Sequence, residues 1–275
     1  EIRLSLVGSE MCIRDRPYYA EHLILATPDN GVAAAMYAAC KATVKVGDGN
    51  EITLHEQTNY PFEETIRFTV NTPKAVSFPF YLRIPSWTEG ATIFVNGKKV
   101  AANPEAGQYA CINREWKDND QVEIQLPMQL SMRTWQVNKN SVSVDYGPLT
   151  MSLKIDEDYV KKDSRATAIG DSKWQEGADA SQWPTYEIYA KTPWNYALVL
   201  GKNEPLKDFK VVHKEWPADN FPFTVASTPI EVKAIGRKVP SWVIDQYDLC
   251  SELPEMDAPK GEKEEITLIP MGAAR

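Results

Sequence analysis

The segment 65–84 reads TIRFTVNTPKAVSFPFYLRI and carries the most regular pattern in this chain of 275 residues. Every second residue in its two halves is apolar, namely Ile66, Phe68 and Val70, and then Phe78, Phe80, Leu82 and Ile84. Successive side chains of a β-strand point to opposite faces, so this alternation is typical of strands with one buried face. The segment therefore predicts two half-buried strands.

The same alternation continues on both sides of this segment. Residues 52–54 and 122–126 repeat it, and Ile93 and Val95 precede the dipeptide Asn96-Gly97. Asn-Gly favours the positive φ angles of a tight hairpin turn, so a hairpin is expected there. Short strands at a spacing of about ten residues, without a convincing helix between them, predict an antiparallel β-sandwich over residues 42–134.

The second half of the chain, residues 135–275, is less regular but also rich in strand patterns. Apolar runs typical of strands occur around residues 142–155, 186–200, 209–212 and 230–235. The polar stretch 156–181 is expected to be a long exposed loop with one helical turn. The predicted fold class is all-β, with two consecutive antiparallel β-sandwich domains, the second of them truncated.

Residues 1–16 are expected not to be native protein sequence. Within them, LVGSEMCIRDR at 6–16 resembles the translated end of a transposon-type sequencing adapter. Artificial segments of this kind are set aside before the fold is considered, so Cys12 is not counted among the cysteines. We expect the native N-terminus to be missing and the chain to be a fragment that is open at both ends.

Composition narrows the classes of function. The 30 Lys and Arg residues and 38 Asp and Glu residues give a formal charge of -8, and no basic cluster could follow a phosphate backbone. The sequence therefore predicts no nucleic-acid partner. No apolar run approaches the roughly 20 residues that span a bilayer, so no membrane span is predicted. Eight Trp and 12 Tyr residues weakly favour a carbohydrate partner.

Cysteine and histidine residues do not form a metal-binding pattern. The native cysteines and the histidines are widely separated, at Cys40, Cys111 and Cys250 and at His22, His55 and His213. Neither set has the C-x-x-C or H-x-x-x-H spacing of a local metal site. We predict no metal ligands and no cofactor in this chain, and we expect the cysteines to be small buried residues.

The carboxylates of the chain do not predict a catalytic pair. A glycosidase needs two carboxyl groups across the scissile bond. Glu63 and Glu64 are adjacent, so their side chains are expected to diverge, and the run 156–158 is expected to be a solvated face. No catalytic residue is therefore predicted.

Aromatic residues are the remaining candidates for substrate contact, because sugar rings stack on Trp and Tyr. Trp194 and Tyr196 are the candidate substrate-binding residues, although neither pattern nor spacing excludes that they cap the core. Trp87, Trp183 and Trp242 lie beside prolines or near expected strand ends and are weaker candidates.

Five motifs, in this order along the chain, resemble a known family. They are TNYPFEETIRFTVN at 58–71, FPFYLRIPSW at 78–87, IFVNGKKV at 93–100, EWKDNDQVEIQLPM at 115–128 and DYGPLTMSLKI at 145–155. Together they resemble the non-catalytic part of bacterial β-L-arabinofuranosidases, glycoside hydrolase family 127 with its close relative family 146. PTYEIYAKTPWNYALVL at 184–200 and EEITLIPMGAAR at 264–275 are similar to the tail of the same proteins.

The resemblance implies that the chemistry lies outside this chain. Members of the family carry an N-terminal (α/α)6 barrel, in which a zinc-bound cysteine thiolate and a glutamate act on terminal L-arabinofuranosyl residues of plant glycans. The adjacent cysteine pair of the family has no counterpart here, so no catalytic or zinc-binding residue is carried over. Residues 17–41 are expected to be the residual end of the barrel region.

The resemblance also implies partners. We expect this chain to be inactive by itself and to pack against its missing barrel through an exposed apolar patch. Glycan substrate would be reached through the parent enzyme, oligomerisation stays open, and a periplasmic or secreted parent is expected. The alternative is a stand-alone carbohydrate-binding or structural β-sandwich module.

Overall fold

The computed structural model describes residues 17–100, 104–167, 174–246 and 249–274, so the expected adapter segment 1–16 lies outside the described residues. The described chain divides into two compact units. The first ends at Leu130 and also includes Tyr146–Leu149, and the second consists of Ser131–Asp145 and the residues from Thr150 onward. No described helix is long and apolar enough to cross a bilayer.

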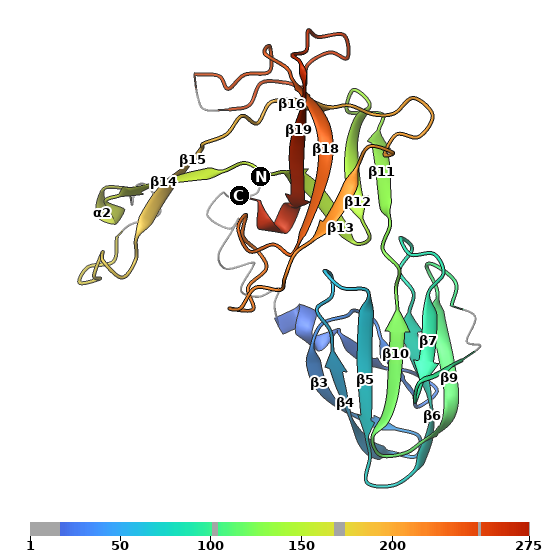
Figure 1. Ribbon diagram of the computed structural model, residues 1–275. Coiled ribbons are helices and arrows are strands. Elements are labelled where there is room, and N and C mark those ends of the chain that lie inside the picture. Colours follow the sequence, from blue (N-terminus) through green and yellow to red (C-terminus); the bar gives the residue numbers. More distant parts are fainter. Residues whose placement is uncertain (1–16, 101–103, 168–173, 247–248, 275) are drawn as a thin grey trace. The chain divides into compact units, whose positions relative to one another are not determined.

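The first unit consists of two sheets (Figure 1). Its strands are β1 (Ile24–Ala26), β2 (Val32–Ala34), β3 (Cys40–Val46), β4 (Asn50–Gln57), β5 (Thr65–Asn71), β6 (Val76–Arg83), β7 (Thr92–Val95), β8 (Lys98–Lys99), β9 (Tyr109–Trp116) and β10 (Asp120–Gln125). One sheet has the order β1-β2-β6-β9 and the other β3-β4-β5-β10-β7-β8. All pairings between these strands are antiparallel except that of β2 with β6.

One continuous core lies between these two sheets. The rings of Phe68 on β5 and Phe80 on β6 meet edge to face at 5.3 Å between centroids. Trp116 is fully buried, and its indole Nε1 donates a hydrogen bond to the carbonyl oxygen of Phe78 at 3.0 Å. Alternate residues of β5 and β6 are buried and contribute to this core. The two half-buried strands predicted from the alternation of apolar residues are therefore confirmed.

The predicted Asn96-Gly97 turn joins β7 to β8. Val95 pairs with Lys98 across it, and the φ angles of Asn96 and Gly97 are 49° and 74°. Two successive positive φ angles define a type I′ hairpin turn, which matches the twist of the flanking strands.

The first sandwich begins before residue 42. Strand β2 lies within the segment 17–41, which we expected to be the end of the barrel region, yet Val32 and Ala34 are fully buried in the core of the sandwich. The physical reason is that β2 pairs in parallel with the central strand β6 and so lies inside its sheet. Gly31 permits this approach, because a Cβ atom there would lie 2.3 Å from the carbonyl oxygen of Pro79.

The second unit is built on a seven-stranded sheet, in which the pairings of β13 with β19 and of β18 with β16, β17 and β19 are antiparallel. Its strands are β11 (Leu130–Trp135), β12 (Ser141–Tyr146), β13 (Leu149–Leu153), β16 (Tyr196–Leu198), β17 (Lys210–His213), β18 (Ile230–Lys238) and β19 (Lys263–Pro270), followed by the 3-10 helix η2 (Met271–Ala273). The strand order is β11-β12-β13-β19-β18-β16, and β17 also pairs with β18. The all-β, antiparallel fold class predicted from the sequence is confirmed.

A separate two-stranded sheet belongs to the second unit. It pairs β14 (Glu157–Lys162) with β15 (Thr185–Ala190), and the short helix α2 (Ser164–Thr167) follows β14. The expectation of a loop over 156–181 is therefore wrong for the residues of β14. The sequence pattern did not indicate this strand because most residues of β14 are charged. The strand forms by pairing with the more apolar β15.

Candidate functional site

A groove of about 470 Å³ in the second unit is lined by Trp194 and Tyr196, the two candidate substrate-binding residues predicted from the sequence. Apolar side chains of β12, β13, β16 and β19 line it, together with Trp194 before β16 and Trp242 after β18. We call this feature the aromatic groove. Its volume lies within the range of pockets that bind small molecules.

The tripeptide Trp194-Asn195-Tyr196 builds one end of the groove. The rings of Trp194 and Trp242 meet edge to face, with 5.1 Å between their centroids. Asn195 holds this pair in place, because its Nδ2 donates hydrogen bonds to the carbonyl oxygens of Val239 and Trp242, both at 3.1 Å. The backbone N–H of Val239 in turn donates to the carbonyl oxygen of Asn195 at 2.8 Å.

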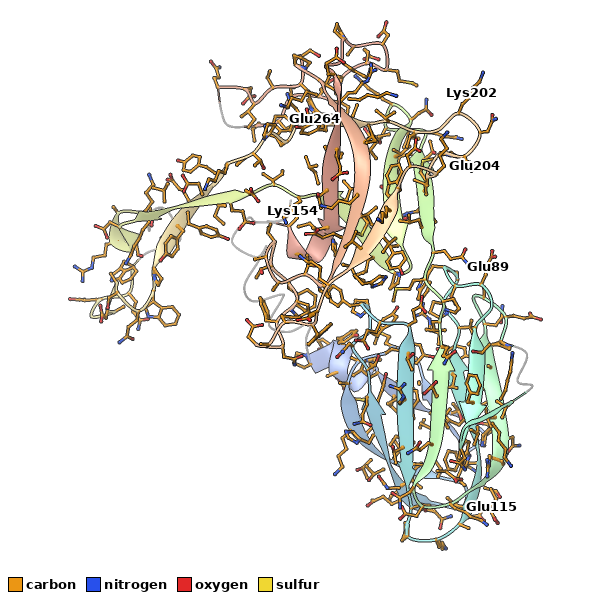
Figure 2. The ribbon with its side chains drawn as sticks, viewed as in Figure 1. Glu89, Glu115, Lys154, Lys202, Glu204 and Glu264 are labelled. Atoms are coloured by element: carbon orange, nitrogen blue, oxygen red, sulfur yellow. The ribbon has the colours of Figure 1, made fainter. Side chains whose placement is uncertain are left out.

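Tyr196 lies beside a pair of opposite charges. The Lys238 Nζ atom is 5.8 Å from the centre of the Tyr196 ring and 3.6 Å from Oε1 of Glu264, which Figure 2 labels. Burial, followed by hydrogen bonding to Glu264, raises the pKa of Tyr196, so its hydroxyl stays protonated at neutral pH. Gly236 leaves room for the ring, since a Cβ atom there would approach Tyr196 to 3.1 Å and Ile266 to 2.8 Å.

Polar groups form part of the groove lining. Lys139 makes an ion pair with Glu255 at 2.7 Å and donates to the carbonyl oxygen of Leu253 at 2.8 Å. Lys260 donates to the carbonyl oxygens of Met256 and Ala258. Aromatic faces next to such groups can stack on a sugar ring and exchange hydrogen bonds with its hydroxyls.

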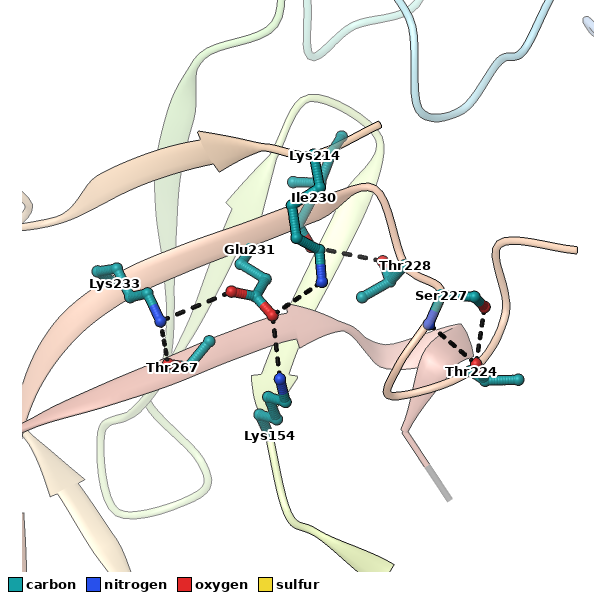
Figure 3. A network of polar contacts seen from close by, with 9 residues as sticks. All are labelled: Lys154, Lys214, Thr224, Ser227, Thr228, Ile230, Glu231, Lys233 and Thr267. Atoms are coloured by element: carbon teal, nitrogen blue, oxygen red, sulfur yellow. Dashed lines mark hydrogen bonds and ion pairs between the residues drawn. The ribbon is translucent and has the colours of Figure 1, made fainter. Parts of the chain in front are cut away.

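A second polar cluster surrounds Glu231 in β18 (Figure 3). Lys154 and Lys214 each contact its Oε1 atom at 3.1 Å, and Lys233 lies 3.6 Å from Oε2. Lys233 also donates to the hydroxyl of Thr267 at 2.7 Å. Burial raises the pKa of Glu231, but the hydrogen bonds from Lys154 and Lys214 outweigh this effect and lower it. The carboxylate thus stays ionised and joins three segments of the second unit.

A buried carboxyl group, Glu56, lies in the first unit at the end of β4. Its Oε1 accepts a hydrogen bond from the backbone N–H of Ala38 at 3.1 Å, and its Oε2 lies 3.6 Å from Sγ of Cys40. Burial raises the pKa of Glu56 to about 8, although both hydrogen bonds lower it. Burial and the neighbouring Glu56 raise the pKa of Cys40 to about 11, so this thiol is protonated and poorly nucleophilic at neutral pH.

The structure separates the other residues considered from the sequence. Glu63 accepts a hydrogen bond from the Asn59 side chain, whereas Glu64 accepts one from the backbone N–H of Met128, so the two adjacent carboxylates have different structural partners. Cys111 and Cys250 are exposed, which contradicts the expectation of burial for these two thiols. Among the described residues, no group of three or more His, Cys, Asp or Glu side chains could hold a metal ion.

Sequence reasoning missed Glu56 and Glu231. The signal for Glu56 was present, because Ile52, Leu54 and Glu56 occupy the same face of an alternating strand and that face is buried. The signal for Glu231 was weaker, since its lysine partners come from β18 itself and from two segments distant in sequence.

Comparison with known proteins identifies a relative of the first unit. Residues 31–128 match the family model described as the middle domain of GH127 β-L-arabinofuranosidase. The resemblance found in the sequence motifs is confirmed for this region. A comparison with curated protein sequences finds no match.

Three solved structures share the fold over most of this chain. A GH127 β-L-arabinofuranosidase from Geobacillus stearothermophilus T6 has a TM-score of 0.58 and 22% identity, covering 92% of this chain and 33% of its own. A structure described as a glycoside hydrolase has a TM-score of 0.52 and 23% identity, covering 90% and 34%. A GH127 β-arabinofuranosidase has a TM-score of 0.54 and 19% identity, covering 90% and 33%. The chain spans about a third of the length of these proteins.

Proposed function

We propose that this chain is the accessory β-sandwich part of a glycoside hydrolase that removes terminal L-arabinofuranosyl or related residues from plant glycans. The observation that carries the proposal is the match of residues 31–128 to the middle domain of GH127 β-L-arabinofuranosidase. The structural likeness supports it, because it extends over 90% or more of this chain and only about a third of each relative. The reaction would take place in the catalytic barrel outside this chain.

The charged side chains of the chain support an accessory role. Asp145 accepts two hydrogen bonds from the Arg133 guanidinium at 2.6 and 2.9 Å, and Glu64 anchors the backbone at Met128. Both carboxylates hold elements of the fold together. The zinc implied by the family resemblance does not fit the described residues, because Cys40 has only Glu56 beside it and no three His, Cys, Asp or Glu side chains among them form a group.

The coding sequence upstream of Pro17 in the native gene tests this proposal. We expect it to encode an (α/α)6 barrel that ends in an adjacent cysteine pair. A signal peptide joined directly to the first sandwich would contradict the proposal, since no catalytic part would then precede the sandwiches.

The aromatic groove favours a second candidate function, binding of a glycan by the chain itself. Trp194, Tyr196 and Trp242 supply the ring surfaces that this function needs. Calorimetric titration with arabino-oligosaccharides would detect it, and Trp194→Ala should weaken binding at least tenfold. Trp183→Ala is the matched control, because Trp183 is exposed and does not line the groove. Equal affinity of both variants and the unaltered chain would exclude the groove as the binding site.

A further inference from the structure

Strands β14 and β15 form a two-stranded sheet that we call the arm. Among the described residues these strands pair only with each other, side by side in Figure 1, and the register aligns Glu157 with Ala190 and Lys162 with Thr185. A two-stranded hairpin is at best marginally stable in water without packing against another layer. The arm therefore needs a covering surface, and its two faces show which side is covered.

One face of the arm carries three exposed apolar side chains between Glu157 at one end and Lys161 at the other. Cross-strand partners share a face, so Tyr159 and Ile188 project together, and Tyr186 projects to the same side two residues away from Ile188. The rings of Tyr159 and Tyr186 meet edge to face at 6.1 Å between centroids. The three side chains are 42%, 44% and 47% exposed for Tyr159, Ile188 and Tyr186. We call these three residues the apolar face of the arm.

The opposite face combines charged and polar side chains with the exposed side chains of Val160 and Tyr189, and two of its charges are paired. Lys162 makes an ion pair with Glu187 at 2.9 Å, and the hydroxyl of Tyr189 donates to the same carboxylate at 2.5 Å. Exposed, paired charges of this kind are suited to water. The apolar face thus carries more exposed apolar side chains than the opposite face, and contiguous side chains of this kind mark an interaction surface.

A carboxylate at the base of the arm indicates what the covering surface must supply. Glu157 lies on the same face as Tyr159, and its Oε2 atom accepts a hydrogen bond from the Tyr159 hydroxyl. Its Oε1 atom is shielded from solvent and has no hydrogen-bond partner among the described residues. A shielded carboxylate oxygen without a donor is costly, so a partner group that donates a hydrogen bond would stabilise it.

A hollow of about 420 Å³ lies beside this carboxylate. Glu157 and Tyr159 line it together with Lys154, Lys191 and the segment 224–226. A partner side chain could enter this hollow while the neighbouring partner surface covers Tyr186 and Ile188. The surface required is therefore apolar, with one Lys, Arg or backbone N–H donor at its edge.

We infer that the apolar face of the arm docks against the catalytic part of the same polypeptide. This inference rests on the proposed function and identifies the contact through which the accessory part would hold its enzyme. The relatives are about three times as long as this chain, and the matching family model describes a middle domain, so their remaining length supplies the occupant. A second copy of this chain is the competing occupant that the experiment must distinguish.

Hydrogen exchange of the β14 and β15 amides tests this contact. It is measured in this chain alone and in the longer enzyme encoded by the native gene, each at two protein concentrations. We expect exchange in the arm to be at least tenfold slower in the longer enzyme, independently of concentration. Equal exchange rates in the two proteins would overturn the inference. Slow exchange that appears in the isolated chain only at high concentration would instead identify a second copy as the occupant.

Paired variants locate the contact on the arm. In the longer enzyme, the double variant Tyr186→Ser and Ile188→Ser should restore fast exchange in the arm, whereas Tyr189→Ser, on the opposite face, should not. Equal effects of the two changes would contradict docking through the apolar face. A longer enzyme that hydrolyses arabinofuranosides while its arm exchanges rapidly would refute only this inference and leave the proposed function intact.

Discussion

The buried carboxyl group of Glu56 makes the stability of the first sandwich dependent on pH. Glu56 is 1% exposed, and the groups that bond to it are the neutral Ala38 N–H and Cys40 thiol. Ionisation therefore places a charge in an apolar site, and burial accordingly raises the pKa of this group from 4.5 to about 8.

The size of the effect follows from this difference in pKa. Below pH 4.5 the carboxyl is protonated in both folded and unfolded chains, and its contribution to stability is fully present. Between pH 4.5 and 8 the unfolded chain releases the proton while the folded chain retains it, so stability falls as pH rises. At 1.36 kcal/mol for each pKa unit, the loss is on the order of 5 kcal/mol at most, and it levels off above pH 8.

The variant Glu56→Gln removes this titration but retains an acceptor for the Ala38 N–H. We expect its free energy of unfolding, relative to that of the unaltered chain, to increase steadily from pH 5 to pH 8. Urea unfolding followed by tryptophan fluorescence measures it, since Trp116 is buried in the same core. The control is Glu115→Gln, an exposed carboxyl of the same unit (Figure 2). A difference between Glu56→Gln and the unaltered chain that is constant across this pH range would refute the reasoning.

Two further changes test the second unit by thermal or urea unfolding. Glu231→Ala leaves the ammonium groups around Glu231 without their shared carboxylate, so we expect the free energy of unfolding to fall by about 2 kcal/mol. Glu264→Ala removes one partner of an exposed ion pair and should lower it by less than about 1 kcal/mol. Gly236→Ala places a Cβ atom 2.8 Å from Ile266 and should cost about 1–3 kcal/mol, whereas Gly261→Ala meets only ordinary contacts and should cost less. Equal losses within either pair would contradict the assigned contacts.

Local patterns predicted most of the first sandwich. Ile66, Phe68 and Val70 reveal β5 because a strand with one buried face must alternate, and Asn96-Gly97 reveals a turn because few other residues adopt two positive φ angles. Both patterns extend over only a few residues, so they can be recognised without knowing which distant segments pack against them.

Features that depend on distant partners could not be predicted in the same way. The apolar residues from Val32 to Tyr37 predict a buried strand, but only the parallel pairing of β2 with β6 decides which unit it joins, and no local pattern indicates that pairing. The contact of Trp194 with Trp242 joins residues on different segments, and no spacing in the sequence indicates it. Strand β14 is likewise defined by β15, across a long connection.

The most direct test of the proposed function is hydrolysis of 4-nitrophenyl β-L-arabinofuranoside by two purified proteins, this chain and the longer polypeptide of the native gene. We predict release of nitrophenol by the longer polypeptide and none above background by this chain. Hydrolysis by this chain alone, or a longer polypeptide that cleaves no arabinofuranoside, would contradict an accessory role in such an enzyme.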